Sequence, residues 1–319
     1  MPPTRIVVAG GTGLLGRALS DHLAAAGHDV IVLTRQPSSA TVDPADANPT
    51  HAGVRLVQWM PDGTAGPWTV FLDGAAAVVN LAGESIGAGR WTAAQKKRLR
   101  ASRLDATRSL AAALPACGMA PGVFVSASAV GYYGVRGEEP LTEKAPPGAD
   151  FLAQLCAGWE GEARKAQFHG RLVLVRSGVV FDREGGALSR MVAPFRLFAG
   201  GPLGSGKQYL SWIHIEDWVA LVGRAIADAS VEGPINATAP NPVTNRDFAR
   251  EVGQVLGRPA WLPAPAFALR ALLGEMADAL LLGGQRVMPA RALDLGFQFR
   301  YPQVRAALES VLRPQVRAD

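Results

Sequence analysis

Closely spaced glycines near the start of the chain are the residues whose type and spacing most directly suggest chemistry. The sequence Gly-Gly-Thr-Gly-Leu-Leu-Gly at residues 10–16 follows an apolar run, residues 6–9, and precedes a helical pattern that reaches Ala26. A strand, glycine turn and helix in this order let the backbone approach a pyrophosphate and turn free helix N–H groups toward it. We therefore expect a dinucleotide cofactor, with contacts at Gly10, Gly13, Leu14, Leu15 and Gly16.

The end of the next β-rich run distinguishes between two dinucleotides. That run, Asp29 to Leu33, completes a βαβ unit, and an NAD-binding protein places Asp or Glu after it to bond the ribose 2′-hydroxyl. This chain has Thr34 and Arg35 there. A guanidinium cannot accept the hydroxyl proton, but it forms a forked pair with a 2′-phosphate. We predict NADP(H), bound through both residues; the alternative is that Arg35 is solvated and an acidic residue elsewhere contacts the ribose.

The elements that would position this turn form an alternating pattern. Strand-like runs at residues 54–59, 76–81, 122–126 and 171–175 are separated by helical patterns, which predicts an α/β fold with a doubly wound parallel Rossmann sheet. Ligands bind outside the carboxyl ends of such strands, so residues 80–83, 126–128 and 177–179 are expected to line one crevice. Each segment could instead simply end its strand. From this crevice we predict cofactor contacts at Gly83, Ser126, Ser177 and Val179.

Composition limits the class of protein. The chain has 319 residues and is 48% hydrophobic, but no apolar run is long enough to cross a membrane and the N-terminus does not resemble a signal peptide. We expect a cytoplasmic protein with no membrane partner. Cys117 and Cys156 have neither metal-ligand spacing nor the density of a disulfide scaffold, so we predict no metal site.

A net charge of +5 and a basic run at residues 96–103 raise nucleic acid as a partner. The excess is modest and no nucleic-acid-binding module is recognisable, so we expect none to bind. Lys96, Arg100 and Arg103 would share one helix face. That face would suit either solvent or an anionic cofactor phosphate, and the sequence leaves the oligomeric state open.

The second half of the chain differs in composition, with frequent proline and glycine from Pro240 onward. We predict an NADP-binding Rossmann domain at residues 1–239, with a substrate-side excursion at about 183–213, and a small C-terminal substrate lobe at 240–319. Residues 201–207 match the Gly-x-x-x-x-Gly-Lys pattern of ATP-binding loops. Gln208 follows where such a loop needs Ser or Thr for magnesium, so we interpret this segment as a substrate-side loop.

Several segments taken together resemble the epimerase-like, atypical extended short-chain dehydrogenases. The resemblance is to the branch labelled nucleoside-diphosphate-sugar epimerases, which has its own C-terminal domain, and it spans nearly the whole chain. The matching segments are residues 10–16, 80–84, 90–92, 126–134, 211–215, 285–289 and 296–297. The resemblance implies an extended Rossmann domain that binds NADP(H), a small C-terminal substrate lobe, and cofactor contacts at Arg35, Leu81, Ala82, Glu84 and Arg103.

The larger superfamily works through Tyr-x-x-x-Lys, in which the lysine lowers the tyrosine pKa so that a proton can pass during hydride transfer. Aligning the helix that contains Glu160 puts Leu152 and Cys156 at those positions. A shift of one residue gives Phe151 and Leu155, which is no better. Ordinary sugar epimerase or reductase chemistry therefore cannot be assumed.

Nearby polar residues are candidates to replace the missing pair. Ser128, Tyr132 and Tyr133 follow a predicted strand at the crevice, and we predict them as catalytic. Simple polar packing is the alternative, because no lysine adjacent in sequence would lower a tyrosine pKa from about 10. His214 lies beside Trp212 and is expected to be structural, with a role as a base as its alternative.

These observations predict an NADP(H)-dependent oxidoreductase or epimerase-like enzyme that acts on an unidentified small molecule. The alternative is a non-catalytic NADP(H)-binding sensor or partner-binding protein that retains the cofactor site and lacks the proton relay. A concave, partly apolar cavity at the nicotinamide end would favour the enzyme. A site filled by protein side chains would favour the sensor.

Overall fold

The computed structural model describes residues 4–36, 49–51 and 53–313, and its strands and helices alternate along most of the chain. The strands are β1 (Arg5–Ala9), β2 (Asp29–Thr34), β3 (Pro49–His51), β4 (Val54–Gln58), β5 (Ala77–Asn80), β6 (Val123–Ala129), β7 (Pro140–Leu141), β8 (Arg171–Ser177), β9 (Val179–Phe181), β10 (Tyr209–Leu210), β11 (Trp212–His214), β12 (Gly233–Ala237), β13 (Val243–Thr244) and β14 (Arg286–Val287). The α-helices are α1 (Leu14–Ala25), α2 (Ala93–Ala113), α3 (Phe151–Ala163), α4 (Gly186–Arg196), α5 (Ile215–Ala227), α6 (Asn245–Leu256), α7 (Ala266–Leu273), α8 (Glu275–Ala277), α9 (Ala290–Asp294) and α10 (Val304–Leu312). Shorter turns are the 3₁₀-helices η1 (Pro67–Phe71), η2 (Leu114–Ala116) and η3 (Val130–Tyr133) and the π-helix η4 (Asp278–Leu282).

Eight strands form the main sheet, in the order β12-β8-β6-β5-β1-β2-β4-β3. Seven of them run parallel, and β3 pairs antiparallel with β4. Strand order reverses between β1 and β5, which creates the crevice where doubly wound sheets bind ligands. The predicted fold class, a doubly wound Rossmann sheet, is confirmed.

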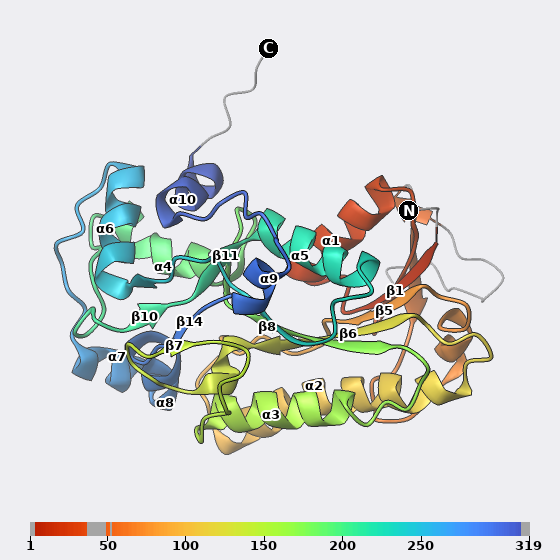
Figure 1. The fold of residues 1–319 in the computed structure, drawn as a ribbon. Helices are drawn as coiled ribbons and strands as arrows, with labels where there is room; N and C mark the ends of the chain where they lie inside the picture. Colours follow the sequence, from red (N-terminus) through yellow and green to blue (C-terminus); the bar gives the residue numbers. More distant parts are fainter. Residues whose placement is uncertain (1–3, 37–48, 52, 314–319) are drawn as a thin grey trace, which may run out of the picture.

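Helices cover both faces of this sheet, with α2 and α3 below it and α1 and α5 above it in Figure 1. Side chains alternate between the two layers along each strand. Within β1, Ile6 and Val8 belong to one core, whereas Val7 and Ala9 belong to the other. This arrangement explains why the strands appear in the sequence as unbroken apolar runs.

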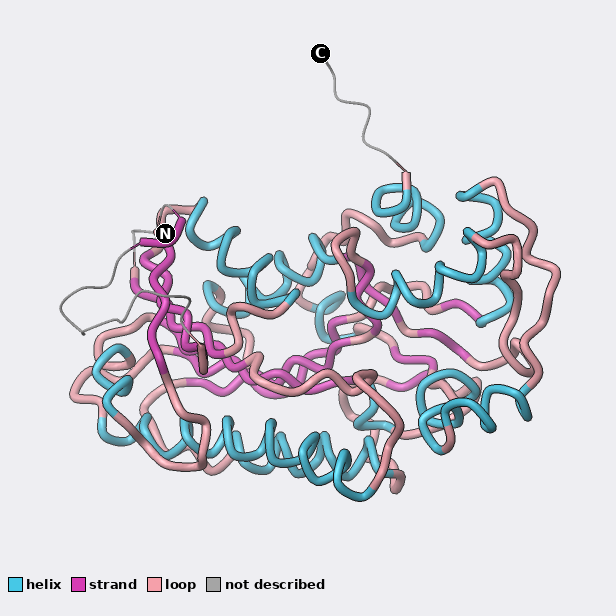
Figure 2. Tube along the Cα trace, turned by 180° about the vertical axis from the view of Figure 1, so that it is seen from behind, coloured by secondary structure: helices cyan, strands magenta, loops and turns pink. Residues whose placement is uncertain are grey.

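A second lobe lies at one end of the sheet, at the right in Figure 2. Its core joins α4, from the predicted excursion, to α6 and α10, from the predicted C-terminal lobe. Phe181 stacks on Trp212 within this core, with 5.1 Å between ring centroids. The excursion and the C-terminal region thus pack together, while residues 1–3 and 314–319 at the ends of the two predicted domains lie outside the described residues.

The predicted end of the strand at residues 122–126 is wrong. We expected the second crevice segment to begin at Ser126, where the strand was predicted to end, but β6 continues to Ala129, so Ser126 and Ser128 lie inside the strand. Both serines pair in register with β8 and are buried. The Ser128 Oγ donates a hydrogen bond to Glu160 at 2.8 Å, which makes its burial tolerable.

Candidate functional site

The glycine turn after β1 brings two backbone segments into close contact. Gly10 has a φ of +78°, and a Cβ added there would lie 2.8 Å from the Ala82 nitrogen. A Cβ on Gly16 would lie 2.3 Å from the Gly10 carbonyl oxygen. Gly13 forms the N-cap of α1 without any side-chain hydrogen bond. The turn therefore leaves the first N–H groups of α1 without a side-chain cap, next to the loop that follows β5.

Thr34 and Arg35 lie where β2 ends. Thr34 is buried, and its Oγ1 accepts a hydrogen bond from the Gln36 nitrogen at 3.4 Å. Arg35 is exposed and has no hydrogen bond or ion pair within the described part of the chain. A guanidinium beside the second strand that has no partner among the described residues is suited to an anionic group such as a 2′-phosphate.

The loop after β5 is fixed on α2. Asn80 is buried, donates through Nδ2 to the Thr107 hydroxyl at 2.8 Å and accepts at Oδ1 from the Ala82 nitrogen at 3.2 Å. The Glu84 nitrogen donates to Ser102 Oγ at 3.0 Å. Leu81, Ala82 and Gly83 are therefore held along the crevice opposite the glycine turn. Gly83 is exposed, and a Cβ on it would lie 3.1 Å from the Arg103 side chain.

A cavity of about 320 Å³ opens between the strand ends and the second lobe. Among the residues predicted as contacts, Arg103, Ser177 and Val179 line it, and so do Leu152 and Cys156, which stand at the positions of the missing Tyr-x-x-x-Lys pair. Ser126, Ser128, Tyr132 and Tyr133 do not line it. The other main lining groups are Trp159 on the α3 side and Leu203, Gln208, Tyr209, Leu280 and Gln285 on the lobe side.

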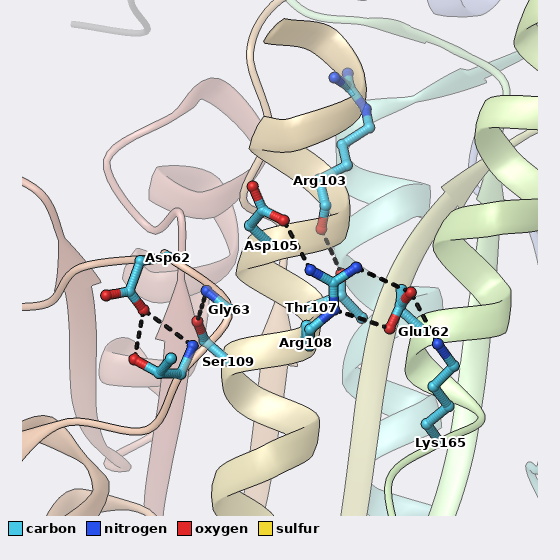
Figure 3. Close-up of polar contacts among 10 residues, drawn as sticks. Asp62, Gly63, Arg103, Asp105, Thr107, Arg108, Ser109, Glu162 and Lys165 are labelled. Atoms are coloured by element: carbon cyan, nitrogen blue, oxygen red, sulfur yellow. Dashed lines mark hydrogen bonds and ion pairs between the residues drawn. The ribbon is translucent and has the colours of Figure 1, made fainter. Parts of the chain in front are cut away.

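Arg103 is the cation nearest to the position of the missing lysine. An ion pair of 3.1 Å between Arg108 and Glu162 joins α2 to α3, and Arg108 also pairs with Asp105 of its own helix at 3.0 Å. Figure 3 shows Arg103 pointing away from these pairs. Burial lowers the pKa of Arg103, whereas the nearby Cys156 and Glu84 act to raise it. The guanidinium remains charged at neutral pH.

Burial raises the pKa of the Cys156 thiol to about 12, although Arg103 opposes the shift. The thiol is therefore protonated at neutral pH and unsuited to nucleophilic chemistry. The nearby Trp159 indole is 6% exposed, and its Nε1 is buried without a hydrogen-bond partner in the described residues. The Arg103 guanidinium, which lines the cavity, offers hydrogen-bond donors without offering a base.

Ser128 and Tyr133 belong to a buried network around Arg176. The Arg176 guanidinium binds the Glu160 carboxylate through two bonds of 2.7 and 2.9 Å. It also donates to the Tyr133 hydroxyl at 3.0 Å, which itself donates to Asn236 at 2.6 Å. Burial raises the pKa of Tyr133 to about 12 despite the neighbouring Arg176. These contacts favour the alternative of polar packing, and the catalytic role of Ser128 and Tyr133 stays a prediction.

Tyr132 lies on the same arginine. Its ring is half-buried, and the Arg176 guanidinium carbon lies 3.5 Å from the ring centroid. A cation therefore lies against the tyrosine ring, and it comes from β8 rather than from a lysine adjacent in sequence. The catalytic role of Tyr132 also stays a prediction.

Lys96 contacts a carboxylate and an aromatic ring, not the solvent or cofactor phosphate that the sequence suggested for its helix face. It forms an ion pair with Glu275 of α8 and lies 4.9 Å from the centre of the Phe151 ring. Of the three cations predicted on that face, Arg103 lines the cavity and Arg100 is exposed. The charge of Lys96 thus holds α2 to the second lobe.

His214 has a structural environment. Its Nδ1 accepts from the Glu216 nitrogen at 3.2 Å and caps α5, and its Nε2 lies 3.1 Å from Ser310 Oγ. Because Nδ1 accepts a hydrogen bond, the proton of the neutral imidazole lies on Nε2. Burial and the nearby Arg300 lower the pKa of His214 to about 4. A neutral, capping imidazole agrees with the expected structural role.

The low pKa of His214 predicts a loss of stability in acid. Between pH 6.5 and 4 the unfolded chain binds a proton that the folded protein excludes, so stability falls as pH falls, by up to about 3 kcal/mol in total. Urea unfolding at a series of pH values should show this slope, and His214→Asn should flatten it. The exposed His169→Asn is the control and should leave it unchanged. An equal slope in wild type and His214→Asn would contradict the prediction.

Sequence patterns singled out few of the residues on the lobe side of the cavity, and they missed Gln208 and Tyr209. Gln208 and Tyr209 follow the Gly-x-x-x-x-Gly-Lys segment, and that segment joins helix α4 to strand β10 rather than a strand to a helix. Its interpretation as a substrate-side loop is consistent with Leu203 and Gln208 lining the cavity. The resemblance at residues 285–289 was the one available signal for Gln285.

Two expectations concern absent features. Among the described residues, no helix is long and apolar enough to cross a membrane. Those same residues contain no group of three or more potential metal ligands. Cys117 and Cys156 are both free thiols.

Comparison with known proteins agrees with the geometry. A family model described as the NAD dependent epimerase/dehydratase family matches residues 6–237, and a domain of unknown function, DUF1731, matches residues 264–311. The chain is 44% identical to the epimerase family protein SDR39U1 homolog, chloroplastic, of Arabidopsis thaliana over 97% of this chain and 86% of that protein. The expectation of a cytoplasmic protein stays a prediction.

Two solved structures are also similar. The crystal structure of human epimerase family protein SDR39U1 (isoform 2) with NADPH has a TM-score of 0.85 and 37% identity, over 96% of this chain and 98% of that one. The nucleoside-diphosphate sugar epimerase from Corynebacterium glutamicum has a TM-score of 0.75 and 34% identity, over 97% of this chain and 58% of that one. The predicted NADP cofactor agrees with the NADPH in the human structure. The sheet, the glycine turn and these matches together show that the chain belongs to the NAD dependent epimerase/dehydratase family.

Proposed function

We propose that this protein is an NADP(H)-dependent oxidoreductase or epimerase-like enzyme that acts on a small molecule. The observation that carries the proposal is the cavity of about 320 Å³, which lies at the ends of β6 and β8 and is not filled by protein side chains. A cavity of this size is at the low end of small-molecule sites. The NADPH held by the human relative supports the same cofactor here.

The residues present fit the cofactor. Cβ atoms would fill the space at Gly10 and Gly16, the first N–H groups of α1 have no side-chain cap, and Arg35 is unpaired within the described residues. In this proposal the turn holds the pyrophosphate and Arg35 binds the 2′-phosphate. The bound nicotinamide supplies the hydride donor or acceptor. Arg103 and the Trp159 indole orient groups at that end of the cavity, and the apolar lobe wall excludes water.

The proton donor is the least determined part of the proposal. Ser128, Tyr132 and Tyr133 stay candidates from the sequence, although none of them lines the cavity. Tyr209 does line it, and the Arg286 guanidinium carbon lies 5.4 Å from its ring centroid. We add Tyr209 as a candidate because its phenol faces a cation without being enclosed. The tyrosine whose replacement by Phe abolishes substrate turnover identifies the donor.

The rival proposal is a non-catalytic NADP(H)-binding sensor. It is favoured by Leu152 and Cys156, which line the cavity at the positions of the missing catalytic pair and cannot relay a proton. The open cavity weighs against it, because a sensor does not need room for a substrate beside the cofactor.

Replacing Arg35 with Ala tests the cofactor part of the proposal. We expect NADPH to bind about 10- to 100-fold more weakly, because charge-assisted hydrogen bonds to the 2′-phosphate are lost. NADH, which lacks that phosphate, should change less than about twofold. Nicotinamide fluorescence titration measures both affinities.

The exposed Arg196→Ala, on α4, removes the same charge and is the control; it should bind both nucleotides like wild type. Equal weakening of NADPH and NADH in Arg35→Ala would remove Arg35 as the contact to the 2′-phosphate. Failure of the wild-type protein to bind either nucleotide would overturn the proposed function.

A further inference from the structure

The cavity wall is almost free of charge. Of the described residues that line it, Arg103 is the one with a formal charge, and it lies at the α2 and α3 end. Its NH1 donates to the Leu99 carbonyl oxygen at 3.2 Å, and it is attracted to Glu84 in the loop beside the glycine turn. The lobe side is formed largely by apolar groups, among them Met191, Leu203, Leu210 and Leu280.

Such a wall does not suit a nucleoside diphosphate. A diphosphate group is recognised by arginine, lysine or the N–H groups at a helix N-terminus, because its charge is costly to desolvate without them. The uncapped N-terminus of α1 and Arg35 are both assigned to the cofactor. Arg103 then remains as one cation at the cofactor end, and the lobe side of the cavity has none among its described residues.

Gln208 has a side-chain amide of fixed orientation on the lobe side of the cavity. Its Nε2 donates to two carbonyl oxygens, Leu203 at 3.0 Å and Leu281 at 2.7 Å. The reversed amide would place Oε1 against both carbonyl oxygens, so the orientation is fixed. Oε1 is buried and has no hydrogen-bond partner in the described residues. This acceptor needs an N–H or O–H donor, and a phosphate oxygen at the same place would be repelled.

We propose that the cavity takes an uncharged, largely apolar substrate with one hydroxyl or N–H group that donates to Gln208 Oε1, and that it does not take a nucleotide sugar. This inference rests on the proposed function for the presence of a cofactor at the strand ends. It concerns a different part of the cavity, formed by the second lobe. The proposed function and the proposed substrate class can therefore fail separately.

Calorimetric titration of the full-length protein saturated with NADP⁺ tests the proposal, using 6-hydroxy-1-tetralone, 1-tetralone and UDP-glucose as probes. We expect both tetralones to bind and UDP-glucose not to bind. The hydroxyl should tighten binding by about 3- to 10-fold, the gain of one hydrogen bond to an otherwise unpaired acceptor. Tighter binding of UDP-glucose than of either tetralone, or no binding of either tetralone, would overturn the proposal.

Replacing Gln208 with Met removes the acceptor at similar volume. The tetralone pair should then bind with affinities within about twofold of each other, whereas Gln154→Met, an exposed glutamine on α3, should keep the wild-type difference. Retention of the full difference in Gln208→Met would contradict the role of Oε1. If Gln208→Met does not fold, the affinities of the two tetralones for the wild-type protein still test the proposal.

Cofactor binding is measured first and separately. If NADP⁺ and NADPH do not bind, the proposed function fails, and the same titrations on the cofactor-free protein still test the cavity. If the nucleotides bind but the tetralones do not, the proposed function stands and the substrate class is wrong.

Discussion

Replacing Gly13 with Asp is expected to abolish the binding of NADPH and NADH together while leaving the fold intact. Gly13 is the N-cap of α1, with a φ of −76° and a ψ of 172°, a conformation open to any residue. A Cβ there would meet one atom within 4 Å, the Gly10 carbonyl oxygen at 3.4 Å. The aspartate should cap the helix, since Asp is a preferred N-cap residue and is slightly better than Gly there.

The same carboxylate would occupy the N–H groups that the pyrophosphate uses and would repel it. At a separation of about 4 Å this repulsion amounts to a few kcal/mol near a protein surface, so the loss should exceed about 100-fold. Fluorescence titration measures it, and thermal unfolding checks the fold. Gly13→Asn, which caps without the charge, should lose much less. An Asp variant that folds and binds NADPH like wild type would exclude the N-terminus of α1 as the cofactor site.

The second large effect concerns the buried pair of Arg176 and Glu160. Their side chains are 2% and 0% exposed, and two hydrogen bonds join them. Arg176→Met leaves the Glu160 carboxylate buried without its main partner. We expect the free energy of unfolding to fall by about 3 to 5 kcal/mol, the cost of breaking a buried ion pair from one side. Urea unfolding measures this loss.

Arg164 provides a matched control, because it also contacts Glu160, at 3.0 Å, but its side chain is 49% exposed. Arg164→Met should cost less than about 1 kcal/mol, since water screens and replaces the exposed contact. Replacing both Arg176 and Glu160 with Met should recover part of the loss, because no uncompensated charge then stays buried. Equal losses in Arg176→Met and Arg164→Met would show that burial does not set the strength of this pair.

Several features of the fold follow from local sequence. The run at residues 6–9, the glycines of residues 10–16 and the following helical pattern predict one βαβ unit, and β1, α1 and β2 lie where this pattern places them. Glycine spacing is informative because the close approach of backbone at Gly10 and Gly16 leaves no room for a Cβ. The predicted cofactor preference also rests on one local residue, Arg35, at the end of one strand.

The interior of the site was not determined locally. Ser128, Tyr132 and Tyr133 lie next to the crevice along the chain, yet Glu160 of α3, Arg176 of β8 and Asn236 of β12 supply the partners that enclose them. Whether a hydroxyl faces a cavity or a buried network depends on groups far away in sequence. No spacing rule along one segment reports those groups.

The sequence by itself determined the parallel sheet, the glycine turn and the preference for a 2′-phosphate, because each depends on residues close together along the chain. Only the tertiary structure decided which side chains line the cavity. The Leu281 carbonyl oxygen, 73 residues further on, accepts a hydrogen bond from the Gln208 amide and so sets its orientation, and Oε1 is left without a partner among the described residues. Side-chain hydrogen bonds of that kind form only after distant segments pack, so the chemistry of the cavity is a property of the folded chain.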